Sequence, residues 1–179
     1  MKRLLPAYPL WVIDPMFSVW SPSDELNGGD TIFWTGKTRK TFGLVRFDGK
    51  TYSFLGRMPG TDALKQEHVS VSVYSTDFTF SCDKFQLKVS FISPLPPEDP
   101  EILSCPVCYT EYEIVPQAGR LPEDFSVAIV LDEGYCYEEA DGVTGGVIPM
   151  RGYEAAWFSR RRNLVLSNAN DCVAPDVLI

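Results

Sequence analysis

The chain has 179 residues, of which 45% are hydrophobic, 13% aromatic and 22% charged, and its formal net charge is −8. This length and apolar content suffice for a domain with a buried core, which excludes disorder as the general state. The negative charge argues against nucleic-acid binding because an acidic surface repels phosphate backbones, and no apolar run approaches the roughly 18 residues of a membrane-spanning helix.

The N-terminal residues resemble a signal peptide only weakly. Lys2 and Arg3 precede an apolar stretch, but Pro6 and Pro9 interrupt it and no small-residue cleavage site follows. The cysteines number five, and an odd number does not suit a disulfide framework. We therefore expect the mature chain to begin at Met1 and to be cytoplasmic, in a compartment that keeps thiols reduced.

Residues 1–60 are the first predicted region, an aromatic-rich segment that contains one β-hairpin. The pair Asp48-Gly49 lies between two strand-like runs, residues 42–47 and 50–54. Both residues of the pair tolerate the positive φ angles of a two-residue type I′ turn, whose twist matches that of the flanking strands. This pattern predicts the hairpin.

Aromatic side chains crowd the first region beside cationic ones: Trp11, Phe17, Trp20, Phe33 and Trp34, with Lys37, Arg39 and Lys40. We expect most of these rings to pack in the core. Aromatic rings with nearby cations can also stack on sugar rings or dock a partner domain. Trp20, Trp34 and Lys37 are therefore the candidates for binding or interdomain contact, and we expect Trp34 to be partly exposed.

Residues 61–179 are predicted to form a β-sandwich region. Apolar and polar residues alternate in Val69 to Tyr74 and in Phe85 to Phe91, which gives each run one apolar face. Residues 109–115 and 125–131 are further β-rich runs, the second apolar enough to be buried on both faces. Asp83-Lys84 is a second expected turn. The only helix expected is Thr61 to Glu67, with Thr61 and Asp62 as caps.

Proline- and glycine-rich segments separate these runs. Residues 94–100 contain four prolines, which lack an amide donor, so we expect a long crossover between two sheets. Residues 117–124 and 138–146 are the other predicted loops. Short strands separated by turns, with little helix, predict an all-β fold: an antiparallel β-sandwich with an N-terminal extended and hairpin segment, incomplete at its C-terminus.

Cys105-Pro106-Val107-Cys108 has the spacing of a redox pair or of half a zinc site. A redox pair needs its first thiol at a helix N-terminus, whereas residues 109–114 have a strand pattern. A zinc site needs two more ligands, and the other cysteines and the single histidine are scattered. We therefore predict ordinary reduced cysteines, with neither a metal nor a cofactor.

Three other polar features are predicted to have no catalytic role: His68 is expected to be a strand-edge or core residue, and the other two are expected to be exposed. His68 has no serine or cysteine partner in a recognisable nucleophile elbow. Arg160 to Arg162 is too short for a nucleic-acid footprint. The carboxylates of one loop could serve acid/base hydrolysis if two of them lined a cleft, but a polar loop favours solvation; they are Asp132, Glu133, Glu138, Glu139 and Asp141.

Several short stretches resemble, in the same order, the glutaminase A-like proteins. They are Leu5–Leu10, Asp14–Ser21, Trp34–Lys37 with Gly43–Tyr52, Phe91–Leu95 with Leu103–Tyr109, and Gly152–Phe158 with Leu166–Asn168 and Ala174–Asp176. In such proteins these segments form a β-sandwich that packs on a C-terminal helical (α/α) toroid of the kind seen in glycoside hydrolases. The resemblance implies hydrolysis of glutamine to glutamate and ammonia by the full-length protein.

The resemblance therefore predicts a truncated, non-catalytic N-terminal module to which no catalytic residue can be transferred. Its implied partner is the helical catalytic domain, in the same chain in full-length relatives or on a separate one. We also expect self-association, because missing strands leave unpaired edges and uncovered apolar surface. The alternatives are a stand-alone carbohydrate-binding β-sandwich, an accessory domain related to glycoside hydrolases, and a self-contained glycosidase or amidase.

Overall fold

The computed structural model describes residues 5–14, 17–117, 119–136, 142–161 and 176–178. The chain divides into two compact units, Met1–Val130 and Leu131–Ile179. Each unit is described by itself. The domain boundary at residue 60 that the sequence suggests stays a prediction.

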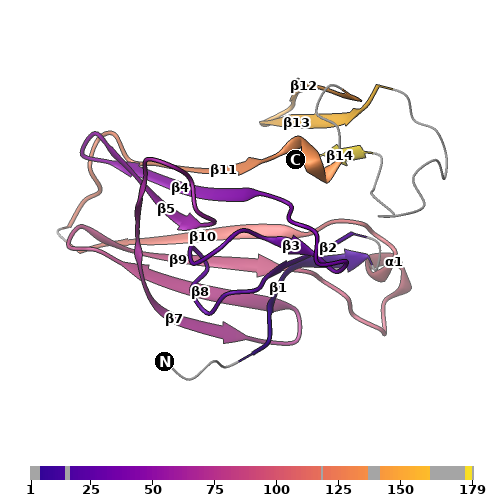
Figure 1. Ribbon diagram of the computed structural model, residues 1–179, viewed down its shortest axis with the longest axis horizontal. Helices are drawn as coiled ribbons and strands as arrows, with labels where there is room; N and C mark the ends of the chain where they lie inside the picture. Colours follow the sequence, from indigo (N-terminus) through magenta and orange to yellow (C-terminus); the bar gives the residue numbers. More distant parts are fainter. Residues whose placement is uncertain (1–4, 15–16, 118, 137–141, 162–175, 179) are drawn as a thin grey trace. The chain divides into compact units, whose positions relative to one another are not determined.

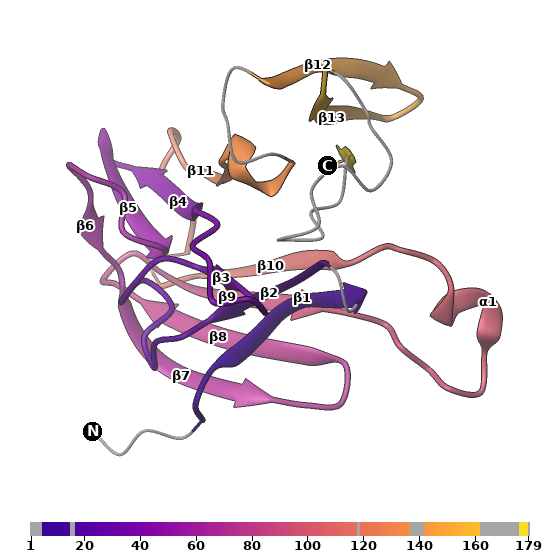
Figure 2. The same ribbon diagram turned by 45° about the vertical axis from the view of Figure 1, so that its right-hand side comes forward.

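The first unit contains three sheets (Figures 1 and 2). Four antiparallel strands in the order β10-β9-β8-β7 form what we call the main sheet: β7 (Lys65–Val71), β8 (Ser75–Ser81), β9 (Phe85–Ile92) and β10 (Tyr109–Pro116). A second sheet has the order β11-β4-β5-β6: β4 (Thr41–Phe47), β5 (Lys50–Leu55), β6 (Asp62–Ala63) and β11 (Ser126–Leu131). A third joins β1 (Tyr8–Asp14), β2 (Phe17–Ser21) and β3 (Ile32–Phe33).

The core lies between the main sheet and the other two sheets. Along β8, Thr76, Phe78 and Phe80 are buried and alternate with more exposed polar residues, as a strand with one covered face requires. Aromatic pairs join the layers: Phe54–Phe80, Phe47–Phe85, Tyr8–Phe78 and Trp11–Phe91, with ring centroids 5.0 to 6.1 Å apart. The predicted all-β, antiparallel, sandwich-like fold is confirmed.

Both predicted turns are present. Asp48 and Gly49 have φ angles of 50° and 72°, the left-handed values that a type I′ turn needs, and they connect β4 to β5. At Asp83-Lys84, the Cys82 amide donates to the Phe85 carbonyl at 3.1 Å and connects β8 to β9.

The predicted helix at Thr61 to Glu67 is wrong. These residues form β6, which pairs in parallel with β5, and the start of β7. The amide of buried Leu64 donates to the Ser53 carbonyl at 2.9 Å, a bond that the helix would have forbidden. So short a helix gains few internal hydrogen bonds, and pairing with existing strands outweighs its capping residues.

The proline-rich segment is not a crossover between sheets. It joins β9 to β10, which are antiparallel neighbours in the main sheet. It contains a four-residue helix, α1 (Pro100–Leu103), in which proline occupies the first turn and the Asp99 carboxylate caps the amides of Glu101 and Ile102. Within the described residues, no helix has the length and apolarity needed to cross a membrane.

Strand β11 also differs from its prediction. Its side chains alternate between exposed and half-buried instead of being buried on both faces. The strand lies at the edge of its sheet, where β4 is its only neighbour among the described strands, so it is less enclosed than a central strand.

The second unit contains a short 3-10 helix, η1 (Glu133–Tyr135), and an antiparallel sheet of β12 (Val143–Met150), β13 (Tyr153–Arg160) and β14 (Asp176–Leu178). Residues 143–146 belong to β12, so this part of the predicted loop is wrong; Gly142 precedes the strand, and residues 138–141 lie outside the described residues. Gly145 and Gly146 face Phe158 and Trp157 across the strand pair, where the aromatic side chains occupy the space beside the glycines.

Candidate functional site

Trp34 projects from a tight turn that follows β3. The Gly36 amide donates to the Phe33 carbonyl at 2.8 Å, and the Phe33 amide donates to the Lys37 carbonyl at 2.9 Å. Gly36 has a φ of 82°, which closes the turn with a residue that tolerates this conformation. The turn leaves Trp34 52% exposed, which confirms the expected exposure, and Lys37 is exposed on the same turn.

Trp20 lies on β2 opposite Ile32, and the carbonyl of Ser18 on the same strand accepts the Trp34 amide of the turn at 3.2 Å. Trp20 is half-buried, and its indole N–H donates to the Ser18 hydroxyl at 2.5 Å. Arg39, another cation of the region, is buried and places its guanidinium 5.0 Å from the centre of the Phe33 ring. Trp11 and Phe33 are buried as predicted. Trp34 and Lys37 are thus the two candidates that share one exposed element.

A second exposed surface lies at one end of the main sheet, where the β7–β8 turn and the β9–β10 connection lie side by side (Figures 1 and 2). The Ser93 amide donates to the Tyr74 carbonyl at 2.8 Å and ties the two loops together. Large apolar side chains are exposed here; we call this group the apolar end: Val73, Tyr74, Ile102, Leu103, Val107 and Tyr109. Val73 is 87% exposed and Tyr109 53%. Large apolar side chains exposed on adjoining loops mark a candidate contact surface.

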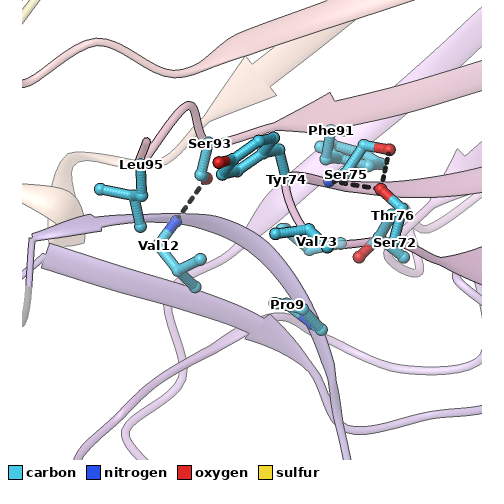
Figure 3. A pocket seen from close by; sticks show the side chains of 11 residues that line it. Pro9, Val12, Ser72, Val73, Tyr74, Ser75, Thr76, Phe91, Ser93 and Leu95 are labelled. Carbon is cyan, nitrogen blue, oxygen red and sulfur yellow. Dashed lines mark hydrogen bonds between the residues drawn. The ribbon is translucent and has the colours of Figure 1, made fainter. Parts of the chain in front are cut away.

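A small pocket of about 50 Å³ opens beside the apolar end, between β1 and the β7–β8 turn (Figure 3). Its walls include Pro9 and Val12 from β1, Val73 from the turn, and Phe91 and Leu95. The polar contacts shown in it are local: Ser75 bonds to Ser72, and the Val12 amide donates to the Ser93 hydroxyl at 3.0 Å. Polar and apolar atoms line the pocket about equally, and it is large enough for a small side chain rather than for a substrate.

The candidate catalytic residues that the structure describes are divided between the two units, with His68 in the first and Asp132 and Glu133 in the second. His68 is an exposed residue of β7. The Asp132 carboxylate accepts the Gly134 amide at 2.6 Å and so caps η1, while Glu133 is exposed. Glu138, Glu139, Asp141 and Arg162 lie outside the described residues. The described part of the chain contains no cluster of three or more metal-ligating side chains.

The cysteines outside position 172 are free thiols. Cys105 is exposed in the β9–β10 connection, and Cys108 is half-buried beside Ser93, with their sulfur and oxygen atoms 3.5 Å apart. Burial raises the pKa of the Cys108 thiol, although the Ser93 hydroxyl and the backbone amides of Ile13 and Val12 oppose that effect.

Sequence reasoning missed the apolar end. Its signal was available: Ile102, Leu103 and Val107 interrupt a segment otherwise made of prolines, acids and small residues. From the sequence alone, apolar residues in such a segment indicate only a linker. The pairing of β8, β9 and β10 decides that this loop lies beside the turn that contains Val73. That pairing brings the two loops together only in the folded chain.

Comparison with known proteins adds two matches. Residues 2–69 match the model of a family described as a domain of unknown function, DUF4964. An alignment over 123 positions, which covers 64% of this chain, shows 32% identity to Glutaminase A of Aspergillus oryzae. No solved structure matches the chain. The predicted resemblance to the N-terminal region of glutaminase A-like proteins is confirmed, and the matched region is 18% of the length of that curated relative.

Proposed function

We propose that the chain is a non-catalytic β-sandwich module of a glutaminase A-like hydrolase, which packs against the helical catalytic domain. The match to 18% of Glutaminase A carries this proposal, because it leaves most of that relative outside the matched region. The free thiols fit the reducing cytoplasm in which we place the protein.

The apolar end is the surface that we assign to this contact. Burying exposed aliphatic and aromatic side chains is the main favourable term in domain association. The β9–β10 connection and β10 also carry five carboxylates, Glu98, Asp99, Glu101, Glu111 and Glu113. The fitting partner surface therefore offers apolar side chains bordered by lysine or arginine. A second copy of this chain fits less well, since the two acidic borders would repel.

The first experiment measures ammonia release from glutamine by the purified chain. We expect none above a heat-inactivated control, because the residues required for amide hydrolysis lie in the partner domain under this proposal. Release that depends on native protein would overturn the non-catalytic assignment.

The second experiment tests the contact with the part of Aspergillus oryzae Glutaminase A that lies outside the matched region. We expect the chain to bind it in a titration followed by light scattering. Val73→Asp should weaken binding at least tenfold, because it places a charge in the apolar contact. Gln86→Asp is the matched control: it adds the same charge at an exposed position at the other end of β9 and should leave binding unchanged. Equal weakening by both variants would contradict the assigned surface.

Trp34 favours one alternative, a carbohydrate-binding sandwich. A half-exposed indole on a hydrogen-bonded turn, beside the cationic Lys37, can stack on a sugar ring with little loss of conformational entropy. Binding on a glycan array that Trp34→Ala abolishes and Trp20→Phe retains would support this alternative. Absence of glycan binding by the wild-type chain would remove it.

A further inference from the structure

Thr76 of β8 carries a buried hydroxyl that has no hydrogen-bond partner in the described part of the chain. Only 1% of the residue is exposed. Thr76 shares the inner face of the main sheet with Phe78, and its neighbour on β9 is Phe91, so apolar side chains surround it. Because a buried hydroxyl without a partner destabilises a fold, this residue calls for an explanation.

Thr76 is one of the residues that line the pocket between β1 and the β7–β8 turn (Figure 3). The serine hydroxyls around the pocket all have partners. The Ser72 hydroxyl accepts the Ser75 amide at 3.1 Å, and the Ser93 hydroxyl accepts the Val12 amide at 3.0 Å. Among the serine and threonine side chains that line the pocket, Thr76 is therefore the one whose hydroxyl is left over.

The size and walls of the pocket define what can enter it. A volume of about 50 Å³ admits a group of a few heavy atoms. Val12, Val73 and Leu95 offer apolar contact to a short stem. None of the residues that line this pocket is charged, so an ammonium or a carboxylate would be buried without a counter-ion.

A hydroxyl suits the pocket better than a carboxamide does. One hydroxyl can give one hydrogen bond to Thr76 or accept one from it, whereas a carboxamide brings two N–H donors and an acceptor that a single hydroxyl cannot satisfy. The fitting occupant is thus short and neutral, with one hydroxyl, which is the chemistry of serine and threonine side chains.

We propose that the pocket binds a serine or threonine side chain of the helical catalytic domain, whose hydroxyl forms a hydrogen bond with that of Thr76. The inference rests on the proposed function and deepens it. The choice of occupant follows from continuity: Val73 and Tyr74 line the pocket and also belong to the apolar end, so a domain that covers the apolar end also covers the mouth of the pocket.

A residue kept for binding should affect the free chain and the complex in opposite directions. Thr76→Val replaces the hydroxyl by a methyl group of similar size. In the free chain it removes an unpartnered polar group from the core, so we expect a higher melting temperature. In the complex it removes a hydrogen bond, so we expect weaker binding. A purely structural role for the hydroxyl would instead lower the melting temperature.

The first test uses the isolated chain and ethanol, which is the threonine side chain as a free molecule. Ethanol is titrated into isotope-labelled protein, and the amide resonances are followed by NMR. We expect saturable shifts at Thr76, Val12 and Val73. Thr76→Ser should retain them and Thr76→Val should lose them. Shifts spread evenly over the strands of the first unit would mean a solvent effect only and would overturn the hydroxyl site.

The second test repeats the titration with the part of Aspergillus oryzae Glutaminase A outside the matched region. Thr76→Val should weaken binding about fivefold, the effect of losing one hydrogen bond. Thr76→Ser should bind like the wild-type chain. Thr79→Val is the matched control, because it makes the same exchange on the outer face of the same strand and should leave binding unchanged.

Ile102→Asp separates this inference from the proposed function, since Ile102 belongs to the apolar end and does not line the pocket. If Ile102→Asp weakens binding and Thr76→Val does not, the docking surface stands and the anchor in the pocket is overturned. If the wild-type chain does not bind at all, the docking function falls and the assigned occupant falls with it. Self-association that Thr76→Val abolishes would make a second copy the occupant and would also overturn the proposal.

Discussion

The carboxylate of Asp124 accepts a hydrogen bond of 2.7 Å from the backbone amide of Gly49, which lies 75 positions earlier in the sequence. Its other oxygen accepts the Asp48 amide at 2.9 Å. Both amides belong to the type I′ turn between β4 and β5. One exposed carboxylate therefore joins the loop that precedes β11 to the tip of a distant hairpin.

Asp124→Asn should lower the melting temperature at neutral pH and should do so less in acid. The Gly49 amide, followed by that of Asp48, lowers the pKa of Asp124, so the folded state favours the charged form. A lowered pKa stabilises the fold above the pKa of the unfolded chain, near 4, and that contribution is lost as the pH falls through the folded value. Melting curves of both proteins from pH 7 to pH 2 measure the convergence.

Asp83→Asn is the control for this prediction. Asp83 is an exposed carboxylate in the neighbouring β8–β9 turn, and its replacement removes the same charge. If both variants shift the melting temperature equally at every pH, the effect would reflect net charge and not the contact with the turn.

Gly43→Ala should destabilise the first unit by about 1–3 kcal/mol, the usual cost of overpacking a core. A Cβ at Gly43 would lie 2.3 Å from an atom of the Phe54 ring and 2.8 Å from the Leu55 Cβ. Gly29→Ala is the matched control, since no atom lies within 4 Å of its added Cβ, and it should be neutral or slightly stabilising. Urea denaturation of the two variants decides: equal stabilities would contradict close packing at Gly43.

The parts of the fold that sequence predicted well are those governed by local rules. Asp48-Gly49 required a turn whatever the rest of the chain did, and the alternation in β8 and β9 defined which face is buried. The errors occur where a distant partner decides. Residues 61–67 have helix-capping residues, but β5 offers Leu64 a carbonyl to bond with.

The candidate site divides in the same way. The exposure of Trp34 was predictable, because the following Thr35-Gly36 indicates a turn. The apolar end was not, because the two loops that carry it are joined only in the folded chain, through the register that pairs Ser75 and Tyr109 with Ile92 and the bond from the Ser93 amide to the Tyr74 carbonyl. Cys108 likewise gains its contact with Ser93 from strand pairing, and not from the spacing of the two cysteines.

Tyr112→Phe should make the protein more resistant to alkaline unfolding between pH 10 and pH 12. Partial burial of its ring raises the pKa of Tyr112 to about 12, although the residue remains 36% exposed; the ring lies edge-on to Phe54 with centroids 6.1 Å apart. The unfolded chain releases this proton near pH 10 while the folded chain retains it, so stability falls as the pH rises through that interval. Thermal melts of both proteins at each pH test the difference.

Tyr109→Phe serves as the comparison for Tyr112, since it removes a phenol from the same strand at an exposed position. We expect it to melt like the wild-type protein across the alkaline range. If Tyr112→Phe loses stability as steeply as the wild-type protein above pH 10, the alkaline destabilisation would come from a titrating group other than Tyr112.

Asn27→Ala should destabilise the first unit by about 1–3 kcal/mol for each carbonyl left buried without a donor. The buried Asn27 amide group donates to the Ser53 carbonyl at 3.0 Å and to the Leu64 carbonyl at 2.8 Å. It thereby joins the connection before β3 to β5 and to the residue between β6 and β7. Asn27→Asp should cost more, because a carboxylate cannot donate to either carbonyl.

Glu25→Ala, two positions away and exposed, is the matched substitution and should leave the urea midpoint unchanged. Amide hydrogen exchange measures the effect locally. In Asn27→Ala, the Leu64 amide, which bonds to the Ser53 carbonyl, should exchange faster than in the wild-type protein, whereas the amides of β8 should stay protected. Unaltered exchange at Leu64 would mean that β5 and β6 hold their pairing without Asn27. The parallel β5–β6 pair would then be stable on its own, and the helix at residues 61–67 would have been excluded by strand pairing alone.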